Sequence, residues 1–306
     1  MLTSNFKFKP AVVMTATAIA CAGLFSLWLL ANNQQYKLTN DNRYHIFCDL
    51  GGVALKSPVQ SEAAKILGYK NLLRYVLSGN NPKKLQNIMF DVMDKLHGQP
   101  HQHPAQYAGR QMPAIMCQMM RGELLPNELV AQVCAGCDAH PEYFTSKTEQ
   151  LLIKRSVECM LPTNICKMQY VDQDMAKLLA TCRQTSNCEL YVLSNWDKGS
   201  SQQLRASFPV IFNNFKAQNI IFSSQTGSMK PEATIFTYAT NKYQLAPNRC
   251  ILIDDQLENV LAARAAGWLA ILHTDAKSTA QELAQLGVFD DQTQVTDTAI
   301  SEPSIS

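Results

Sequence analysis

Short apolar runs recur along the chain, and in its second half they alternate with segments of helical periodicity. The runs at residues 46–48, 189–193, 219–222, 250–253 and 269–272 have the length and composition of buried strands. Strands that alternate with helices are typical of crossover connections in a parallel sheet. The pattern therefore predicts an α/β fold with a Rossmann-like parallel sheet.

The segment at residues 57–169 interrupts this alternation. It shows helical periodicity at residues 71–77, 84–96 and 124–133, with loop residues at 98–104 and 137–143. We therefore expect a helical insertion after the first strand. The expected organisation is a membrane anchor or signal at 1–31, a linker at 32–42, a core at 43–56 and 170–290, the helical insertion at 57–169 and a disordered polar tail at 291–306.

The chain begins with a long apolar stretch. Residues 11–31 carry no charge and approach the roughly 20 residues that cross a bilayer core, with Lys7 and Lys9 before them. Cleavage after the small residues Ala20-Cys21-Ala22 would leave an apolar remnant on the mature protein. An uncleaved anchor is therefore favoured over a cleaved signal peptide, and both over a buried helix.

Lys7 and Lys9 favour a cytoplasmic amino terminus, whereas Lys37 and Arg43 beyond the apolar stretch oppose it. We expect the anchored protein to place its body outside the cytoplasm, and a cleaved signal would make it secreted or periplasmic.

The ten cysteines bear on whether the protein resides in an oxidising or a reducing compartment. They are compatible with an oxidising one, in which Cys182 and Cys188 could bridge a helix-to-strand turn, or with reduced core thiols in the cytosol. Cys134 and Cys137 alone are a weak signal for zinc.

The composition limits the classes of molecule that the protein is expected to bind. Of the 306 residues, 46% are hydrophobic and 17% are charged, which is typical of a globular protein. The net charge of +2 gives no strong electrostatic attraction to nucleic acid. A small-molecule ligand is therefore expected, while the oligomeric state is left open.

Polar residues that could take part in catalysis or ligand binding follow four of the predicted strands. They are Asp49, the pair Ser194 and Asn195, Lys230 before Pro231, and the pair Asp254 and Asp255. Since ligands bind at the carboxyl ends of parallel strands, these groups should meet at one edge. Pro231 is expected at the first position of a helix. A nucleophilic carboxylate, a hydroxyl, a cation and a carboxylate pair suit Mg²⁺ and phosphoryl transfer.

The stretches "FCDLGGV", "YVLSN", "MKPEATIF" and "LIDDQLENVLAARAAGW" resemble, in order and context, the four motifs of the haloacid dehalogenase superfamily. With "RGEL" in the insertion, the chain is most similar to the branch related to glucose-1-phosphate phosphatase. The resemblance implies a helical cap and a phosphoaspartyl intermediate on Asp49.

The same resemblance implies roles for the remaining site residues. Ser194, Asn195, Lys230 and Gly52 would bind the phosphate. Asp49, the backbone carbonyl of Gly51, Asp254 and Asp255 would hold Mg²⁺. The substrate would be a small phosphorylated metabolite, such as a sugar or acyl phosphate.

Gly51 departs from the motif of most phosphatases of the superfamily, which place a second Asp there as general acid and base. Metal binding is expected to survive this change, whereas proton transfer is in doubt. A catalytically silent binding module is the main alternative and a 2-haloacid dehalogenase a weaker one. An oxidoreductase is disfavoured because no glycine-rich dinucleotide turn follows a strand.

The insertion contains two further groups of polar residues. His97, His101 and His103 are expected to be exposed loop histidines rather than a metal site. Arg121 and Glu123 are expected to fix helix packing rather than to touch the substrate.

Overall fold

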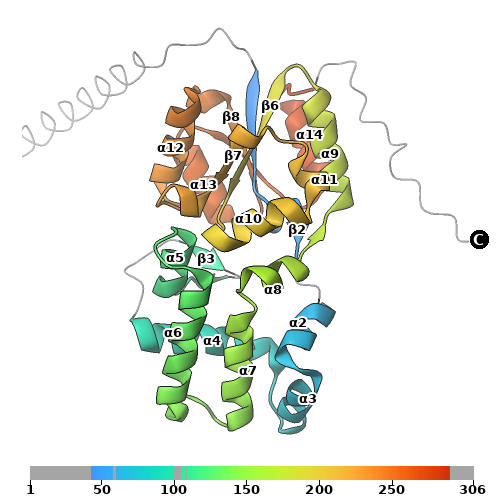
Figure 1. Ribbon diagram of the computed structural model, residues 1–306. Coiled ribbons are helices and arrows are strands. Elements are labelled where there is room, and N and C mark those ends of the chain that lie inside the picture. Colours follow the sequence, from blue (N-terminus) through green and yellow to red (C-terminus); the bar gives the residue numbers. More distant parts are fainter. Residues whose placement is uncertain (1–42, 58–59, 99–104, 108, 290–306) are drawn as a thin grey trace, which may run out of the picture.

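The computed structural model describes residues 43–57, 60–98, 105–107 and 109–289 (Figure 1). Its centre is a five-stranded sheet in the order β7-β6-β1-β8-β9, with all neighbouring strands parallel. The strands are β1 (Tyr44–Cys48), β6 (Cys188–Ser194), β7 (Ile220–Phe222), β8 (Cys250–Asp254) and β9 (Leu269–Leu272). The predicted α/β fold with a parallel sheet is thus confirmed.

Helices cover both faces of this sheet because the strand side chains alternate between two apolar cores. Ile46 and Cys48 of β1 belong to one core, and Phe47 belongs to the other. The first face carries α9 (Gln173–Gln184), α10 (Lys198–Ser207), α11 (Pro209–Phe212) and α14 (Ala276–Gln285), and the second carries α12 (Ala233–Tyr243) and α13 (Leu257–Ala265) (Figure 1).

A separate helical unit follows β1 in the chain and lies at one end of the sheet (Figure 1). Its entry strand β2 (Leu55–Lys56) and exit strand β5 (Tyr170–Val171) pair antiparallel. Between them lie α2 (Gln60–Leu67), α3 (Tyr69–Leu77), α4 (Leu85–His97), α5 (Ala114–Met120), α6 (Pro126–Ala139), α7 (Lys147–Glu158) and α8 (Pro162–Lys167). The unit has its own apolar core, which includes Phe90, Leu129 and Leu152. The domain boundaries given above stay predictions.

The prediction of a loop at residues 137–143 was wrong for the first half of this segment. Helix α6 continues to Ala139, because Val133 and Cys137 lie on its buried face and extend the packing by a turn.

A short hairpin of β3 (Gln106–Tyr107) and β4 (Arg110–Gln111) was not anticipated. Its anchor is Arg110, which donates hydrogen bonds to Asp91 and Asp94 of α4.

The turn after α5 joins the helical unit to the core. Arg121 donates to the Glu232 carboxylate from Nε at 2.9 Å and from Nη2 at 2.5 Å. At Gly122, with φ +78°, an added Cβ would lie 2.4 Å from the carbonyl oxygen of Ser224. The position therefore needs glycine, and Arg121 fixes the unit against the core.

Several predictions fall outside the described residues: the apolar stretch at 1–31, the linker, the tail, and His101 and His103. None of the helices that the structure describes combines the length and the apolar character needed to cross a bilayer.

All nine described cysteines are free thiols. Cys182 and Cys188 are not bonded to each other, although the Sγ of Cys188 lies 3.1 Å from the carbonyl oxygen of Cys182.

We expect Phe47→Ala to lower the free energy of unfolding by about 3–5 kcal/mol, because a large buried ring would leave a cavity. Phe47 is fully buried, and its ring centroid lies 4.6 Å from those of both Tyr191 and Trp268. Chemical denaturation measures the loss. Leu77→Ala is the control, since Leu77 is 77% exposed and its truncation should cost little. Equal losses would contradict the assignment of the core.

Candidate active site

Asp49 occupies the turn directly after β1, beside the end of β8. Its backbone N–H donates to the carbonyl of Ile253, so the two strand ends are held together at 2.9 Å. Its Oδ1 accepts hydrogen bonds from Ser194 Oγ at 2.5 Å and from the Leu50 N–H at 2.8 Å. Within the described residues, Oδ2 takes part in no hydrogen bond or ion pair. One carboxylate oxygen is therefore fixed while the other is left available.

Lys230 is fully buried between two of the predicted acidic residues. Its Nζ lies 3.1 Å from Asp49 Oδ1 and 2.5 Å from Asp254 Oδ2. Burial alone lowers the pKa of Lys230, but the charges of Asp254 and Asp49 outweigh this effect and raise it. The ammonium group stays charged in the interior of the site.

Three carboxylates come together around this cation. Asp49, Asp254 and Asp255 each offer an oxygen atom, and these atoms all lie within 4.8 Å of one another. Burial raises the pKa of Asp49 to about 7; Lys230 opposes this, and Asp254 and Asp255 add to it. Burial and Asp254 likewise raise the pKa of Asp255. Clustered carboxylates with hard oxygen donors are what Mg²⁺ requires, so the donor set fits a divalent cation.

Asp254 is held rigidly at the end of β8. Its Oδ1 accepts hydrogen bonds from the Gln256 N–H and from Asn259 Nδ2, both at 2.9 Å. With Oδ2 on Lys230, both of its oxygens are engaged. Asp255, in contrast, is exposed, and it is the carboxylate of the pair that is freer to take a metal ion.

Asn195 lies where predicted, after β6, yet its side chain has a structural task. Its amide exchanges two hydrogen bonds with the backbone of Lys230, both at 2.9 Å. This contact locks the lysine loop to the end of β6. Any contact of Asn195 with a phosphate stays a prediction.

The helix expected to begin at Pro231 begins later, so that prediction was wrong. Helix α12 starts at Ala233 with Glu232 as its N-cap, and Lys230 lies in the preceding turn. The reason is that the Glu232 carboxylate accepts bonds from Ser228 Oγ, the Met229 N–H and Arg121, which hold residues 228–232 in a turn.

The two glycines after Asp49 differ in their surroundings. Gly52 has φ +78°, and an added Cβ would lie 2.0 Å from Asp255 Oδ2. Its N–H already donates to the carbonyl of Leu55. At Gly51, an added Cβ would meet only Trp196 Cζ2, at 3.8 Å. Gly52 is therefore required by the approach of Asp255, whereas Gly51 has room for a side chain.

Sequence reasoning missed two basic residues beside the site. Lys56 of β2 donates to the carbonyl of Gly52 and lies 3.3 Å from Nε2 of His273. Its charge acts to lower the pKa of Asp255. His273 follows β9 directly, so inspection of every strand end would have found it. Lys56 does not directly follow a predicted strand, so the sequence pattern did not indicate it.

Tyr107 of β3 was also missed. Its ring is 45% exposed, yet burial by surrounding protein and the charge of Asp255 both raise the pKa of its phenol. Within the described residues this hydroxyl has no hydrogen-bond partner. Tyr107 thus brings the helical unit within electrostatic reach of the carboxylate cluster.

Residues 140–267 match the family model described as haloacid dehalogenase-like hydrolase. The chain contains a haloacid dehalogenase-like hydrolase domain. The matched residues include Ser194, Lys230, Asp254 and Asp255, while Asp49 lies before them and joins them through the sheet. The superfamily predicted from the four motifs is confirmed, and the glucose-1-phosphate phosphatase branch stays a prediction.

A sesquiterpene phosphatase of Aspergillus oryzae is 26% identical over 130 residues, which are 36% of this chain. The chain spans 65% of the length of that relative. A HAD family enzyme of Bacteroides thetaiotaomicron, in complex with magnesium and inorganic phosphate, is 16% identical with a TM-score of 0.45, covering 75% of this chain and 93% of its own.

The L-2-haloacid dehalogenase of Xanthobacter autotrophicus, with chloropropionic acid covalently bound, is 12% identical with a TM-score of 0.43. The similarity covers 81% of this chain and 85% of the dehalogenase. These comparisons identify no substrate for this chain.

We expect Gly52→Ala to destabilise the protein by at least about 1–2 kcal/mol and to weaken binding of Mg²⁺, because the backbone is left-handed and the new methyl group would displace Asp255. Gly51→Ala is the matched control one residue away and should leave both properties near the wild-type values. Thermal unfolding and calorimetric titration with Mg²⁺ measure the two effects. Equal affinity of the two variants for Mg²⁺ would contradict the prediction that Asp255 binds the ion.

Proposed function

We propose that the chain is a Mg²⁺-dependent phosphatase that hydrolyses a small phosphorylated metabolite through an aspartyl-phosphate on Asp49. The observation that carries this proposal is the position of Asp49, with one oxygen fixed by Ser194, Leu50 and Lys230 and the other without a hydrogen bond or ion pair to any described residue. Such an arrangement orients a carboxylate for attack.

In the first step, Oδ2 of Asp49 attacks the phosphorus atom, and the bond from phosphorus to the leaving oxygen breaks. Lys230 keeps its charge beside Asp49 and stabilises the negative charge on the phosphoryl group. The Ser194 hydroxyl, now bound to Asp49, is placed to donate to a phosphate oxygen instead. In the second step, water attacks the phosphorus atom of the aspartyl-phosphate, the bond from phosphorus to Asp49 Oδ2 breaks, and inorganic phosphate leaves while the proton of the water passes to solvent.

Asp49, Asp255 and Asp254 would hold Mg²⁺, with the Gly51 carbonyl as a further ligand. The ion would neutralise charge on the phosphate. Asp254 is the least free of these ligands, since Lys230 and Asn259 occupy its oxygens. Asp255 is therefore the principal ligand of the pair in this proposal.

Gly51 limits the substrate. Without a carboxylate at this position, no side chain of the turn can protonate the leaving oxygen. A good leaving group needs this help least, which favours an anomeric sugar phosphate or an acyl phosphate. The relative from Aspergillus oryzae is described as a sesquiterpene phosphatase, which extends the range to phosphate esters of apolar alcohols.

The helical unit acts as a cap in this proposal. The charge of Asp255 raises the pKa of Tyr107, so this side chain lies within electrostatic reach of the site and is proposed to contact the leaving group. The hairpin that carries it is held on α4 by Arg110 and by the packing of Phe90 against Tyr107, with ring centroids 6.1 Å apart. A rigid cap residue of this kind would contribute to the choice of substrate.

We also propose that residues 11–31 anchor the protein in a membrane, with the catalytic body outside the cytoplasm. Support comes from the absence of charge over this stretch and from Lys7 and Lys9 before it. Cleavage as an export signal would place the same body in the periplasm or outside the cell.

We expect Mg²⁺-dependent release of phosphate from a panel of sugar, acyl and isoprenoid phosphates, and its loss by at least about a thousandfold in Asp49→Asn. Asp138→Asn is the control, because this exposed carboxylate of α6 lies outside the site. Circular dichroism verifies folding. Silence of the wild type across the panel, with Mg²⁺ still bound, would instead indicate a binding module.

Gly51→Asp should raise the rate on alkyl phosphates by about tenfold or more, since it supplies the missing acid at a position with room for a side chain. Substrates with good leaving groups should gain little. Gly51→Asn is the matched control, because it has the same size but cannot transfer a proton. If both variants behave alike, the leaving-group explanation of Gly51 fails.

A further inference from the structure

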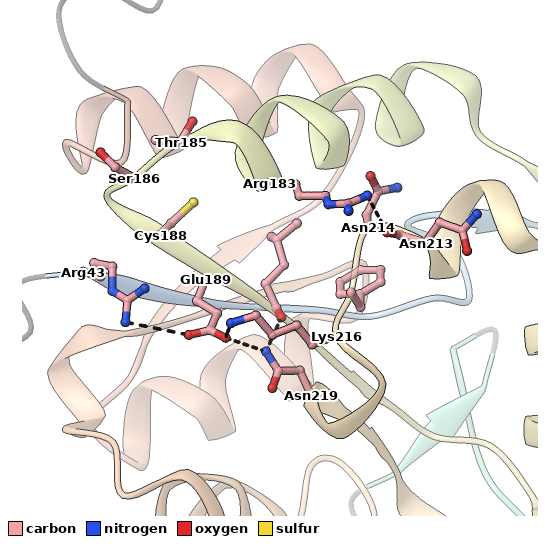
Figure 2. A pocket seen from close by; sticks show the side chains of 12 residues that line it. Arg43, Arg183, Thr185, Ser186, Cys188, Glu189, Asn213, Asn214, Lys216 and Asn219 are labelled. Carbon is pink, nitrogen blue, oxygen red and sulfur yellow. Dashed lines mark hydrogen bonds and ion pairs between the residues drawn. The ribbon is translucent and has the colours of Figure 1, made fainter.

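A cavity of about 450 Å³ lies at the end of the sheet opposite Asp49 (Figure 2). Its walls include the amino ends of β1 and β6, the turn after α9 and residues 213–219. Asp49 and Ser194 stand at the carboxyl ends of the same two strands. The volume lies within the range of small-molecule sites, and the position separates this cavity from the candidate active site.

The side chains lining this cavity carry an excess of positive charge. Arg43, Arg183 and Lys216 face a single carboxylate, that of Glu189. Glu189 accepts hydrogen bonds from Lys216 Nζ at 2.7 Å and from Asn219 Nδ2 at 3.0 Å, and Arg43 lies 3.9 Å away (Figure 2). The carboxylate is thus fully engaged, and the lining keeps a net charge of +2.

Arg183 stands apart from this network (Figure 2). Its Nη1 donates to the backbone carbonyl of Asn213 at 2.7 Å, which orients the guanidinium. Among the described residues, no carboxylate pairs with it. Since a guanidinium has five N–H donors, most of its hydrogen-bonding capacity is left for a ligand.

A second hollow of about 580 Å³ adjoins the first and shares Arg183, Asn213 and Phe215 with it. This hollow adds Arg205, whose guanidinium lies 5.5 Å from the ring centroid of Phe222 and has no carboxylate partner within the described residues. The two adjoining hollows are therefore lined by four cations and one carboxylate, in a chain whose overall net charge is only +2. Neighbouring like charges repel, and a bound anion would relieve this repulsion.

We propose that this cavity binds a small oxyanion, namely inorganic phosphate or a phosphate ester, at a site distinct from the catalytic centre. Arg183 supplies the forked donor that suits a phosphate, Lys216 adds positive charge in the cavity, and Arg205 adds it from the adjoining hollow. Ser186 also lines the cavity, and its hydroxyl group could contact the rest of an ester. The proposal does not depend on the phosphatase activity of Asp49.

The test titrates the full chain with inorganic phosphate and, separately, with glucose 6-phosphate by calorimetry in the presence of a chelator. Without divalent cations, the three carboxylates at Asp49 disfavour an anion there, so the heat reports on the distal cavity. We expect binding that weakens about tenfold or more in Arg183→Gln and also weakens in Arg205→Gln. Preference for the ester over phosphate identifies which of the two the cavity takes.

Arg155→Gln is the matched control, because it removes one positive charge from α7, where Arg155 pairs with Glu158 at 3.0 Å. Its affinity should equal that of the wild type, as should the affinity of Ser194→Ala. Three results would overturn the proposal: no binding by the chelated wild type, unchanged affinity in both arginine variants, or loss of binding in Ser194→Ala, which would place the anion at the catalytic centre.

Discussion

The site is organised around the buried ammonium group of Lys230. A buried charge is tolerated only when it is paired and hydrogen-bonded, and here Asp49 and Asp254 supply the pairing. The two carboxylates can flank it because β1 and β8 are adjacent parallel strands that end together, with Cys48 beside Ile253. Asn195 holds the lysine loop through two backbone hydrogen bonds. The charge balance of the site therefore depends on the pairing of β1 with β8 and on the position of the loop that carries Lys230.

The same loop connects the site to the helical unit. Glu232, two residues after Lys230, closes the turn through Ser228 and also pairs with Arg121. Gly122 then approaches the backbone of Ser224 too closely for any side chain. The position of the helical unit is thus fixed close to the cation that orients Asp49. A phosphatase with a cap would need this kind of link, because the cap must meet the reacting group in a defined geometry.

Charge is distributed unevenly along the strands. The carboxyl ends of β1 and β8 gather three carboxylates around one ammonium group, whereas the amino ends of β1 and β6 border a cavity with three cations and one engaged carboxylate. The first arrangement suits a metal cation and the second suits an anion. Asp49 and Arg43 flank β1, six positions apart in sequence, so the strand separates the two sites.

The sequence by itself determined the parallel sheet and the order of the site residues. Buried strands are apolar and ligand-bearing residues follow them, so residues 250–255 indicated both a strand and two carboxylates. The start of α12 could not be predicted, because Arg121, 111 residues away, helps to hold Glu232 in the preceding turn.

Only the tertiary structure showed Lys56 and Tyr107 near the carboxylates and placed Arg183 and Lys216 at one cavity. These groups come from elements that are distant in sequence. Their proximity is set by packing, which no local pattern of residues encodes.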